Sequence, residues 1–234
     1  MVSLYAISDL HLSFGKNKPM DVFEGWEDYA NRLEKNWKNI VTKYDSVVIA
    51  GDISWAMNLS GSRDDFLFLE SLPGEKIIMR GNHDYWWGSV KKINDFFSVS
   101  GFKSVKLLHN NAIETQDFCV CGARGWLCRP QSDHDVKICK REIQRLELSL
   151  SSAEGSKSEK IAFMHYPPIY GGEEFEDVFD VLKKYEIKRC YYGHVHGKDA
   201  FKRSFIGEYK GVNLELISCD YTGFTPKLVP KGRF

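Results

Sequence analysis

Short runs of β-branched and aromatic residues alternate with longer amphipathic stretches over the first hundred residues of the chain. This alternation is typical of strands joined by helical crossovers, so it predicts a largely parallel sheet covered by helices. The predicted strands are residues 2–7, 46–50 and 76–79, and the predicted helices are residues 24–41, 63–72 and 88–97.

The rhythm changes at about residue 105, where short apolar runs follow one another with only turn-like residues between them. This part predicts a second, more antiparallel sheet. A later stretch alternates charges at helical spacing and has apolar residues on one side, which indicates a helix with a solvated outer face. The predicted elements are strands 105–108, 112–115 and 118–122, helix 133–152, an exposed loop at 151–160, strand 161–164, helix 176–185, strand 189–192, and a closing hairpin of 204–209 with 212–217.

Length and composition favour one soluble α/β domain. With 234 residues, of which 43% are hydrophobic, the chain can bury a sizeable core, and we expect a single domain over residues 1–234. Basic and acidic residues number 32 each, so no net field would attract nucleic acid or an anionic membrane. No apolar run approaches the roughly 20 residues of a membrane span, and no basic leader precedes the first one. We therefore expect a cytoplasmic protein whose six cysteines are reduced thiols.

Candidate chemistry lies in five short segments, each directly after a predicted strand. Side chains at such positions, where the chain leaves the sheet, can converge on one crevice. Each segment alone is a weak signal, but together they contain five of the seven histidines. The segments are Asp9-Leu10-His11, Gly51-Asp52, Gly81-Asn82-His83-Asp84, His165 and Gly193-His194-Val195-His196.

The residue types in these segments indicate a transition-metal site. Oxygen and imidazole ligands together suit manganese, iron or zinc, whereas calcium takes oxygen ligands only and structural zinc sites use thiolates. Residues two apart on an extended segment can present both side chains to one side, so Asp9/His11 and His194/His196 can chelate one ion or divide between two. A carboxylate can also bridge two ions held roughly 3.5 to 4 Å apart, and Asp52 is the candidate bridge.

The five segments, in this order, resemble the signature of the calcineurin-like metallophosphoesterase family, and the resemblance runs from Asp9 to His196. It implies the metallo-dependent phosphatase fold, an α/β four-layer sandwich of two mixed β-sheets flanked by α-helices. It also implies a binuclear centre of divalent ions, which would be Mn²⁺, Fe²⁺/Fe³⁺ or Zn²⁺. Position by position, it implies that Asp9, His11 and His196 hold the first ion, that Asn82, His165 and His194 hold the second, and that Asp52 joins them.

The same resemblance implies hydrolysis of a phosphate monoester or diester by a hydroxide that bridges the two ions. Metal binding makes this hydroxide available because it lowers the pKa of a bound water to about 7. In the family, the histidine that matches His83 assists the leaving group, and its acidic neighbour, here Asp84, orients the ring. The alternative role for His83 is that of an extra metal ligand.

Three further features have two interpretations each. Arg124 and Trp126 follow the predicted strand 118–122 and are candidates for substrate binding, the guanidinium through phosphate and the indole through stacking on a ring. A surface arginine and a core tryptophan explain them as well. The aromatic run of residues 85–87 fits either a pocket wall or core packing.

Two other functions stay open. The opening residues 8–13 also resemble the lipid-A-pathway pyrophosphohydrolases of the same superfamily, but those usually carry arginine where this chain has His83. That difference disfavours a lipid substrate and leaves small phosphate esters and nucleotides, including pyrophosphate cleavage of a nucleotide-type substrate. A retromer subunit resembles the family yet acts as a scaffold after losing part of its ligand set, whereas no predicted ligand is missing here. The sequence does not indicate the oligomeric state.

Overall fold

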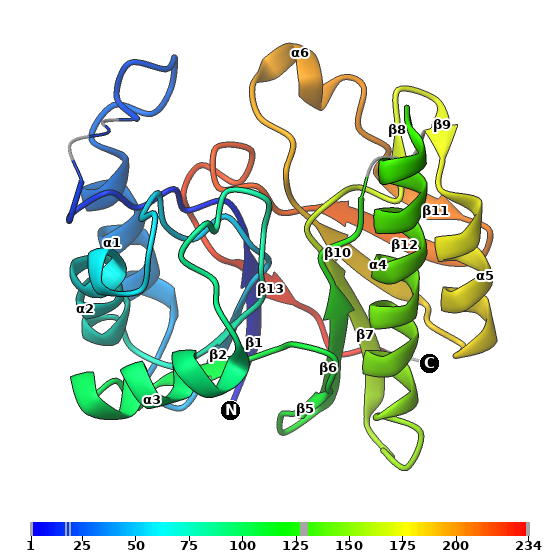
Figure 1. Cartoon of the computed structure of the whole chain (residues 1–234), viewed down its shortest axis with the longest axis horizontal. Coiled ribbons are helices and arrows are strands. Elements are labelled where there is room, and N and C mark those ends of the chain that lie inside the picture. Colours follow the sequence, from blue (N-terminus) through cyan, green and yellow to red (C-terminus); the bar gives the residue numbers. More distant parts are fainter. Residues whose placement is uncertain (1, 17, 19, 127–130, 233–234) are drawn as a thin grey trace.

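Most residues of the inner strands are apolar and buried, as expected of strands that are covered on both faces. The computed structural model describes residues 2–16, 18, 20–126 and 131–232. In Figure 1, two mixed sheets lie next to each other in the middle, with helices on their outer sides. The predicted sandwich of two mixed sheets flanked by helices is therefore confirmed.

The first sheet has the strand order β13-β1-β2-β3-β4. Strands β1 to β4 run parallel, and β13 pairs with β1 in the antiparallel sense. The predicted parallel sheet of the first hundred residues is thus confirmed. Its elements are β1 (Leu4–Ile7), α1 (Tyr29–Ile40), β2 (Ser46–Ile49), the 3₁₀ helix η1 (Ser60–Ser62), α2 (Arg63–Ser71), β3 (Glu75–Ile78), α3 (Val90–Ser100), β4 (Val105–Leu107) and β13 (Lys227–Val229).

The second sheet has the strand order β11-β12-β10-β7-β6-β5. Its elements are β5 (Ile113–Glu114), β6 (Phe118–Ala123), α4 (Asp133–Ser151), β7 (Glu159–Met164), α5 (Glu176–Lys184), β10 (Arg189–Tyr192), β11 (Gly207–Tyr209) and β12 (Val212–Leu216). A short hairpin of β8 (Ile169–Tyr170) with β9 (Glu173–Glu174), and the helix α6 (Lys198–Phe201), lie outside it.

Two predictions about the second half of the chain are wrong. The strand that begins at Val105 is not part of the second sheet, because β4 pairs with β3 at the edge of the first. The second sheet is also parallel at its centre, where β6, β7, β10 and β12 run in one direction. Among the described residues, its antiparallel pairs lie at its two edges, and one of them is the predicted hairpin of β11 and β12.

Helix α1 begins later than predicted. Asp28, directly before it, has a φ of 53°, in the left-handed region that a helix cannot continue through. Residues 20–28 instead form turns. This leaves a loop of aromatic residues, including Phe23 and Trp26, close to the site described below.

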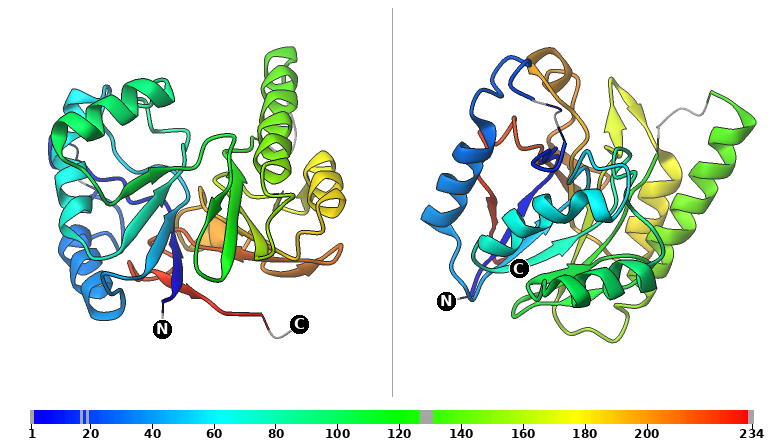
Figure 2. Two further views of the ribbon diagram at one scale, coloured as in Figure 1. Left: turned by 90° about the horizontal axis from the view of Figure 1, so that it is seen from below. Right: turned by 60° about the vertical axis from the view of Figure 1, so that its left-hand side comes forward.

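Three apolar clusters hold the layers together. One lies between the two sheets and contains Ala6, Val48, Phe163 and Tyr191. A second lies between the first sheet and α1, α2 and α3, and a third between the second sheet and α4 and α5. The two further views in Figure 2 show the same division of the helices between the two sides.

Two smaller expectations concern cysteines and membrane spans. The described cysteines are free and buried, as expected of reduced thiols, while Cys128 lies outside the described residues. No helix in the described part of the chain is long and apolar enough to cross a membrane.

The layered core predicts a large difference between two leucines in helices. Leu33 in α1 is fully buried, whereas Leu148 in α4 is 53% exposed. Replacing Leu33 with Ala should lower the free energy of unfolding by about 2 to 5 kcal/mol, because it removes buried methyl groups and leaves a cavity. Leu148→Ala is the matched control and should change it by about 0.5 kcal/mol or less. Urea unfolding of both variants measures the difference, and equal losses would contradict the assigned core.

Candidate metal centre

The seven predicted ligands lie together where strands of the two sheets end on the same side. Asp9 and His11 follow β1, Asp52 follows β2, and Asn82 follows β3 in the first sheet. His165 follows β7, and His194 and His196 follow β10 in the second. Parallel strands share the edge at which they end, so the sheet topology alone brings these distant segments together.

The first group consists of Asp9, His11 and His196. The Nε2 atoms of His11 and His196 are 3.4 Å apart, and His196 Nε2 is 3.5 Å from Asp9 Oδ1. The three residues can each offer one ligand atom within 4.8 Å of the others, which suits one metal ion. Asp9 and His11 are buried, and His196 is partly exposed.

The second group consists of Asn82, His165 and His194. Asn82 Oδ1 lies 2.6 Å from His165 Nε2 and 2.9 Å from His194 Nδ1. The carboxylate of Asp52 lies between the two groups, with Oδ2 3.5 Å from His165 Nε2 and 3.8 Å from His11 Nε2. Asp9 reaches the second group as well, because its Oδ1 is 3.7 Å from His165 Nδ1. Two carboxylates, rather than Asp52 alone, therefore adjoin both groups.

Four of the predicted ligands have left-handed backbone conformations. The φ angles are 63° at Asp9, 46° at His11, 51° at Asp52 and 71° at His194. These values correct the expectation that Asp9 and His11 reach the site from an extended segment. Non-glycine residues with positive φ cost energy and cluster at functional sites, where surrounding contacts enforce them.

Two glycines of the sequence motifs allow close approach of the loops. A Cβ atom on Gly81 would overlap Asp52 Oδ1, and one on Gly193 would overlap Ser8 Oγ. Neither glycine has a positive φ, so the requirement is for space and not for backbone freedom. The glycines before Asn82 and His194 thus hold their loops against the loops that carry Asp52 and Asp9.

Backbone N–H groups orient the carboxylates of Asp52 and Asp9. The backbone N–H of His83 donates to Asp52 Oδ1 at 2.7 Å, which leaves Oδ2 directed at His165 and His11. The backbone N–H of His194 donates to Asp9 Oδ2 at 2.9 Å. Each carboxylate is therefore oriented by the loop of another ligand.

The hydrogen bonds of His165 fit a metal on its Nε2 atom. Its Nδ1 lies 3.0 Å from the carbonyl oxygen of Ala50, which can only accept, so Nδ1 carries the proton. Burial lowers the pKa of His165, so the ring is neutral and Nε2 presents a lone pair. That lone pair faces Asn82 Oδ1, which is also an acceptor. Two acceptor atoms that face each other in a buried site repel. A cation bound between them would remove this repulsion.

The pKa values of His11, His194 and Asp52 also fit a metal centre. Burial lowers the pKa of His11 and that of His194, the latter to about 3, which keeps both rings in the neutral form that binds metals. Burial and the charge of Asp9 raise the pKa of Asp52 to about 8. Two buried carboxylates this close repel each other, and divalent cations would remove that cost. The donor set therefore fits a pair of divalent ions.

Asp220 belongs to the site, although no pattern in the sequence indicated it. Its Oδ1 lies 2.9 Å from His196 Nδ1, and its Oδ2 accepts from the backbone N–H of Gly197 at 3.0 Å. Burial would lower the pKa of His196, but Asp9 and Asp220 outweigh it and raise the pKa to about 10. A carboxylate on the far nitrogen of a ligating histidine fixes the ring and its tautomer.

Asp84 does not orient the ring of His83, which corrects the role implied by the resemblance. Its carboxylate is fully buried and lies between loops that carry ligands. The group that lies within hydrogen-bond distance of the ring of His83 is instead the hydroxyl of Tyr85, 3.4 Å from Nδ1. Asp84 accepts hydrogen bonds from the backbone N–H groups of Asp52, Ile53, Ser54 and Gly81 and from Trp86 Nε1, at 2.7 to 3.3 Å.

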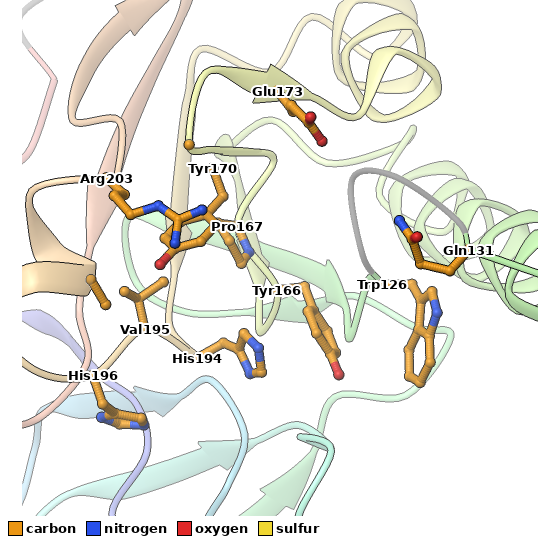
Figure 3. Close-up of a pocket in the computed structure, with 12 residues that line it drawn as sticks. Trp126, Gln131, Tyr166, Pro167, Tyr170, Glu173, His194, Val195, His196 and Arg203 are labelled. Atoms are coloured by element: carbon orange, nitrogen blue, oxygen red, sulfur yellow. The ribbon is translucent and has the colours of Figure 1, made fainter.

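The remaining candidates divide between core and cavity. Arg124 is paired with the buried Glu142, at 3.1 Å between Nη2 and Oε1, which argues against the predicted contact with substrate. Trp126 lines a cavity beside His194 (Figure 3). Trp86 and Trp87 are buried in the core, so core packing is the correct interpretation for them, whereas Tyr85 is 51% exposed.

Comparisons with known proteins agree with the fold. A family model described as calcineurin-like phosphoesterase matches residues 2–198. An uncharacterised protein of Methanocaldococcus jannaschii is 32% identical over 115 residues, which cover 47% of this chain and 60% of that protein. The match therefore spans less than two thirds of that relative.

Two solved structures share the fold at low sequence identity. The phosphopantetheinyl hydrolase of Mycobacterium tuberculosis is 14% identical, with a TM-score of 0.59 over 99% of this chain and 96% of that one. A protein of unknown function from Aquifex aeolicus is 17% identical, with a TM-score of 0.53 over 97% and 96% of the two chains. At these identities the likeness shows a common fold and nothing finer.

The close approach at Gly81 predicts a specific loss of metal binding. Gly81→Ala would push the new methyl group into Asp52 Oδ1, so affinity for Mn²⁺ should fall by about 10-fold or more. Gly88→Ala is the matched control, because the nearest atom to its new Cβ is Lys92 Cβ at 3.9 Å. Calorimetric titration of the metal-free proteins with Mn²⁺ measures both. Unchanged affinity in Gly81→Ala would show that this contact does not position Asp52 for metal binding.

Proposed function

The chain belongs to the calcineurin-like phosphoesterase family, and from this premise we propose that it is a metal-dependent hydrolase of a small phosphate ester. One observation carries the proposal. Two buried carboxylates, one amide and four imidazoles converge from five distant segments, with acceptor atoms facing one another at 2.6 to 3.8 Å. A purely structural role does not account for this concentration of metal-binding groups.

We assign Asp9, His11 and His196 to one ion, Asn82, His165 and His194 to the other, and Asp52 to both. Asp9 is close enough to His165 to contribute to the second ion as well. When bound, the ions would acidify a water molecule to supply the nucleophile, and they would neutralise the charge of the phosphate. The metals that suit this mixed oxygen and nitrogen set are Mn²⁺, iron and Zn²⁺.

His83 is the residue that we assign to the leaving group. It is partly exposed, and its ring lies 5.8 Å from that of His11 and 4.6 Å from that of Trp55, measured between centroids. Burial and the neighbouring His165 lower the pKa of His83, so the ring is mainly neutral at pH 7. A neutral imidazole can still donate its N–H to the charge that develops on the leaving oxygen.

Asp84 has a positioning role in this proposal. Its carboxylate accepts hydrogen bonds from the backbone N–H groups of Asp52 and Ile53 in one loop and from that of Gly81 in the loop that carries Asn82. It therefore fixes the distance between the bridging carboxylate and one ligand of the second ion. Burial and the charge of Asp52 raise the pKa of Asp84 to about 6, which reflects the cost of keeping this charge inside the protein.

A screen with controlled metal content tests the proposal. We expect the purified chain to bind two Mn²⁺ ions and to hydrolyse p-nitrophenyl phosphate or methyl p-nitrophenyl phosphate, because the donor set suits two ions at one phosphate. Metal analysis and release of p-nitrophenolate are measured on the same sample. Two ions per chain without turnover of any ester would favour a scaffold, and failure to bind metal would contradict the centre itself.

His83→Asn should separate catalysis from metal binding. Metal content should stay at the wild-type level while kcat falls by roughly 10²- to 10⁴-fold, since only the leaving-group donor is lost. His134→Asn is the control, because His134 is exposed and lies outside every motif. Loss of one ion in His83→Asn would instead show that His83 is a ligand.

A further inference from the structure

Two cavities of similar size meet at the metal centre. The first, which we name the Tyr166 cavity, has a volume of about 590 Å³ and includes Trp126, Tyr166, His194 and Arg203 in its lining. The second, the Trp26 cavity, has a volume of about 570 Å³ and includes His11, Trp26 and His83. His196 lines both. Each cavity is large enough for an organic group, and a phosphate bound at the metal centre would fill neither of them.

The Tyr166 cavity presents flat aromatic faces next to the second metal group. The rings of Trp126 and Tyr166 have centroids 5.3 Å apart, and Tyr166 lies 4.1 Å from the ring of His194. Figure 3 shows these three side chains side by side along one wall. The indole N–H of Trp126 donates to Asp135 at 3.1 Å, which fixes the orientation of the ring. Rigid aromatic faces of this kind favour a planar ring in the ligand.

Arg203 adds a cation at the other end of this cavity. Its guanidinium lies over the ring of Tyr170, 4.7 Å from the centroid (Figure 3). Among the described residues, Arg203 forms no ion pair with a carboxylate, although Glu173 also lines the cavity. The cavity thus has aromatic rings next to the second metal group and a positive side chain at its other end.

The Trp26 cavity adjoins the first metal group and contains the leaving-group donor. Trp26 packs edge-on against His196, with 5.7 Å between centroids, and Trp55 stacks on His11 at 4.8 Å. Phe23 lines the cavity and is 55% exposed, so its ring is accessible to an organic group there. His83 lines this cavity and not the other.

We propose that the substrate is a phosphate diester, with one organic group in each cavity. The leaving group lies in the Trp26 cavity because His83 is there, and the group that stays on phosphorus, a planar aromatic ring, lies in the Tyr166 cavity. In the reaction, the oxygen of water forms a bond to phosphorus and the bond from phosphorus to the leaving oxygen breaks. The leaving oxygen takes up one proton, so the products are a monoester and an alcohol. This inference rests on the proposed phosphohydrolase function.

Two diesters with the same leaving group and the same charge test the assignment. Methyl p-nitrophenyl phosphate and phenyl p-nitrophenyl phosphate differ only in the group that stays on phosphorus. After correction for the uncatalysed rates, kcat/KM of the wild-type protein should be about 10- to 100-fold higher for the phenyl ester, the range expected for stacking on aromatic side chains. The same correction should place the phenyl diester above the monoester p-nitrophenyl phosphate.

Variants of the two cavities should respond differently to the two diesters. Trp126→Leu should bring the phenyl-to-methyl ratio of kcat/KM close to 1, because the indole contacts the phenyl group and the methyl group does not reach it. Phe23→Ala should lower kcat/KM for both diesters by a common factor, since they share the leaving group. Tyr44→Leu is the control, because Tyr44 is 67% exposed and lines neither cavity.

Binding of the products gives a readout that is independent of turnover. Calorimetry with the manganese-loaded protein should find phenyl phosphate bound about 10-fold more tightly than methyl phosphate, and Trp126→Leu should remove that difference. Equal binding and equal kcat/KM in the wild type would overturn the diester assignment, yet hydrolysis of the methyl ester would leave the proposed function intact. An equal loss on both diesters in Trp126→Leu would also overturn it. No hydrolysis of any ester by protein with two bound ions would overturn both.

Discussion

The repulsion between two buried carboxylates is the constraint around which this structure is organised. Asp9 and Asp52 are at most 1% exposed, and both lie within 3.7 Å of the same imidazole, that of His165. Charges of one sign at this separation are unfavourable in a medium of low dielectric constant unless cations lie beside them. The imidazoles of His11, His165 and His194 are neutral and supply lone pairs, whereas His196, whose pKa Asp9 and Asp220 raise to about 10, is the one that adds positive charge. A pair of divalent ions would balance this arrangement, and the rest of the site holds the side chains where those ions would need them.

The scaffold maintains this geometry at the cost of local backbone strain. Four ligand residues have positive φ, and glycines at positions 81 and 193 let the ligand loops approach each other. The buried carboxylate of Asp84 then joins two of these loops through backbone N–H groups. Strain of this kind persists only where surrounding contacts enforce it, which the parallel strands below the loops and the apolar layer between the sheets provide. The same contacts keep His83 next to the proposed ligands, with its ring 5.8 Å from that of His11 between centroids.

The sequence predicted the strands, and the segments that converge after them, where the local pattern carries the information. Short apolar runs identify β1, β2 and β3, and the positions of histidines after strands identify the convergent segments because few other uses explain them. Pairing between strands is a tertiary property, so three residues from Val105 could not reveal to which sheet they belong. The late start of α1 depends on the backbone of Asp28, which the amphipathic pattern does not encode.

Within the site, the errors concern contacts between residues distant in sequence. Asp84 is adjacent to His83 in sequence, but its side chain points to the N–H groups of other loops. Asp220 is a single aspartate after β12, and only the fold places it against His196. The two cavities combine residues from many segments and could not be found from any one of them.

Anomalous diffraction from crystals of the manganese-loaded protein tests the central claim most directly. The account predicts two anomalous peaks roughly 3.5 to 4 Å apart. One should lie beside Asp9, His11 and His196 and the other beside Asn82, His165 and His194, with Asp52 contacting both. A single peak, or peaks away from these side chains, would contradict it.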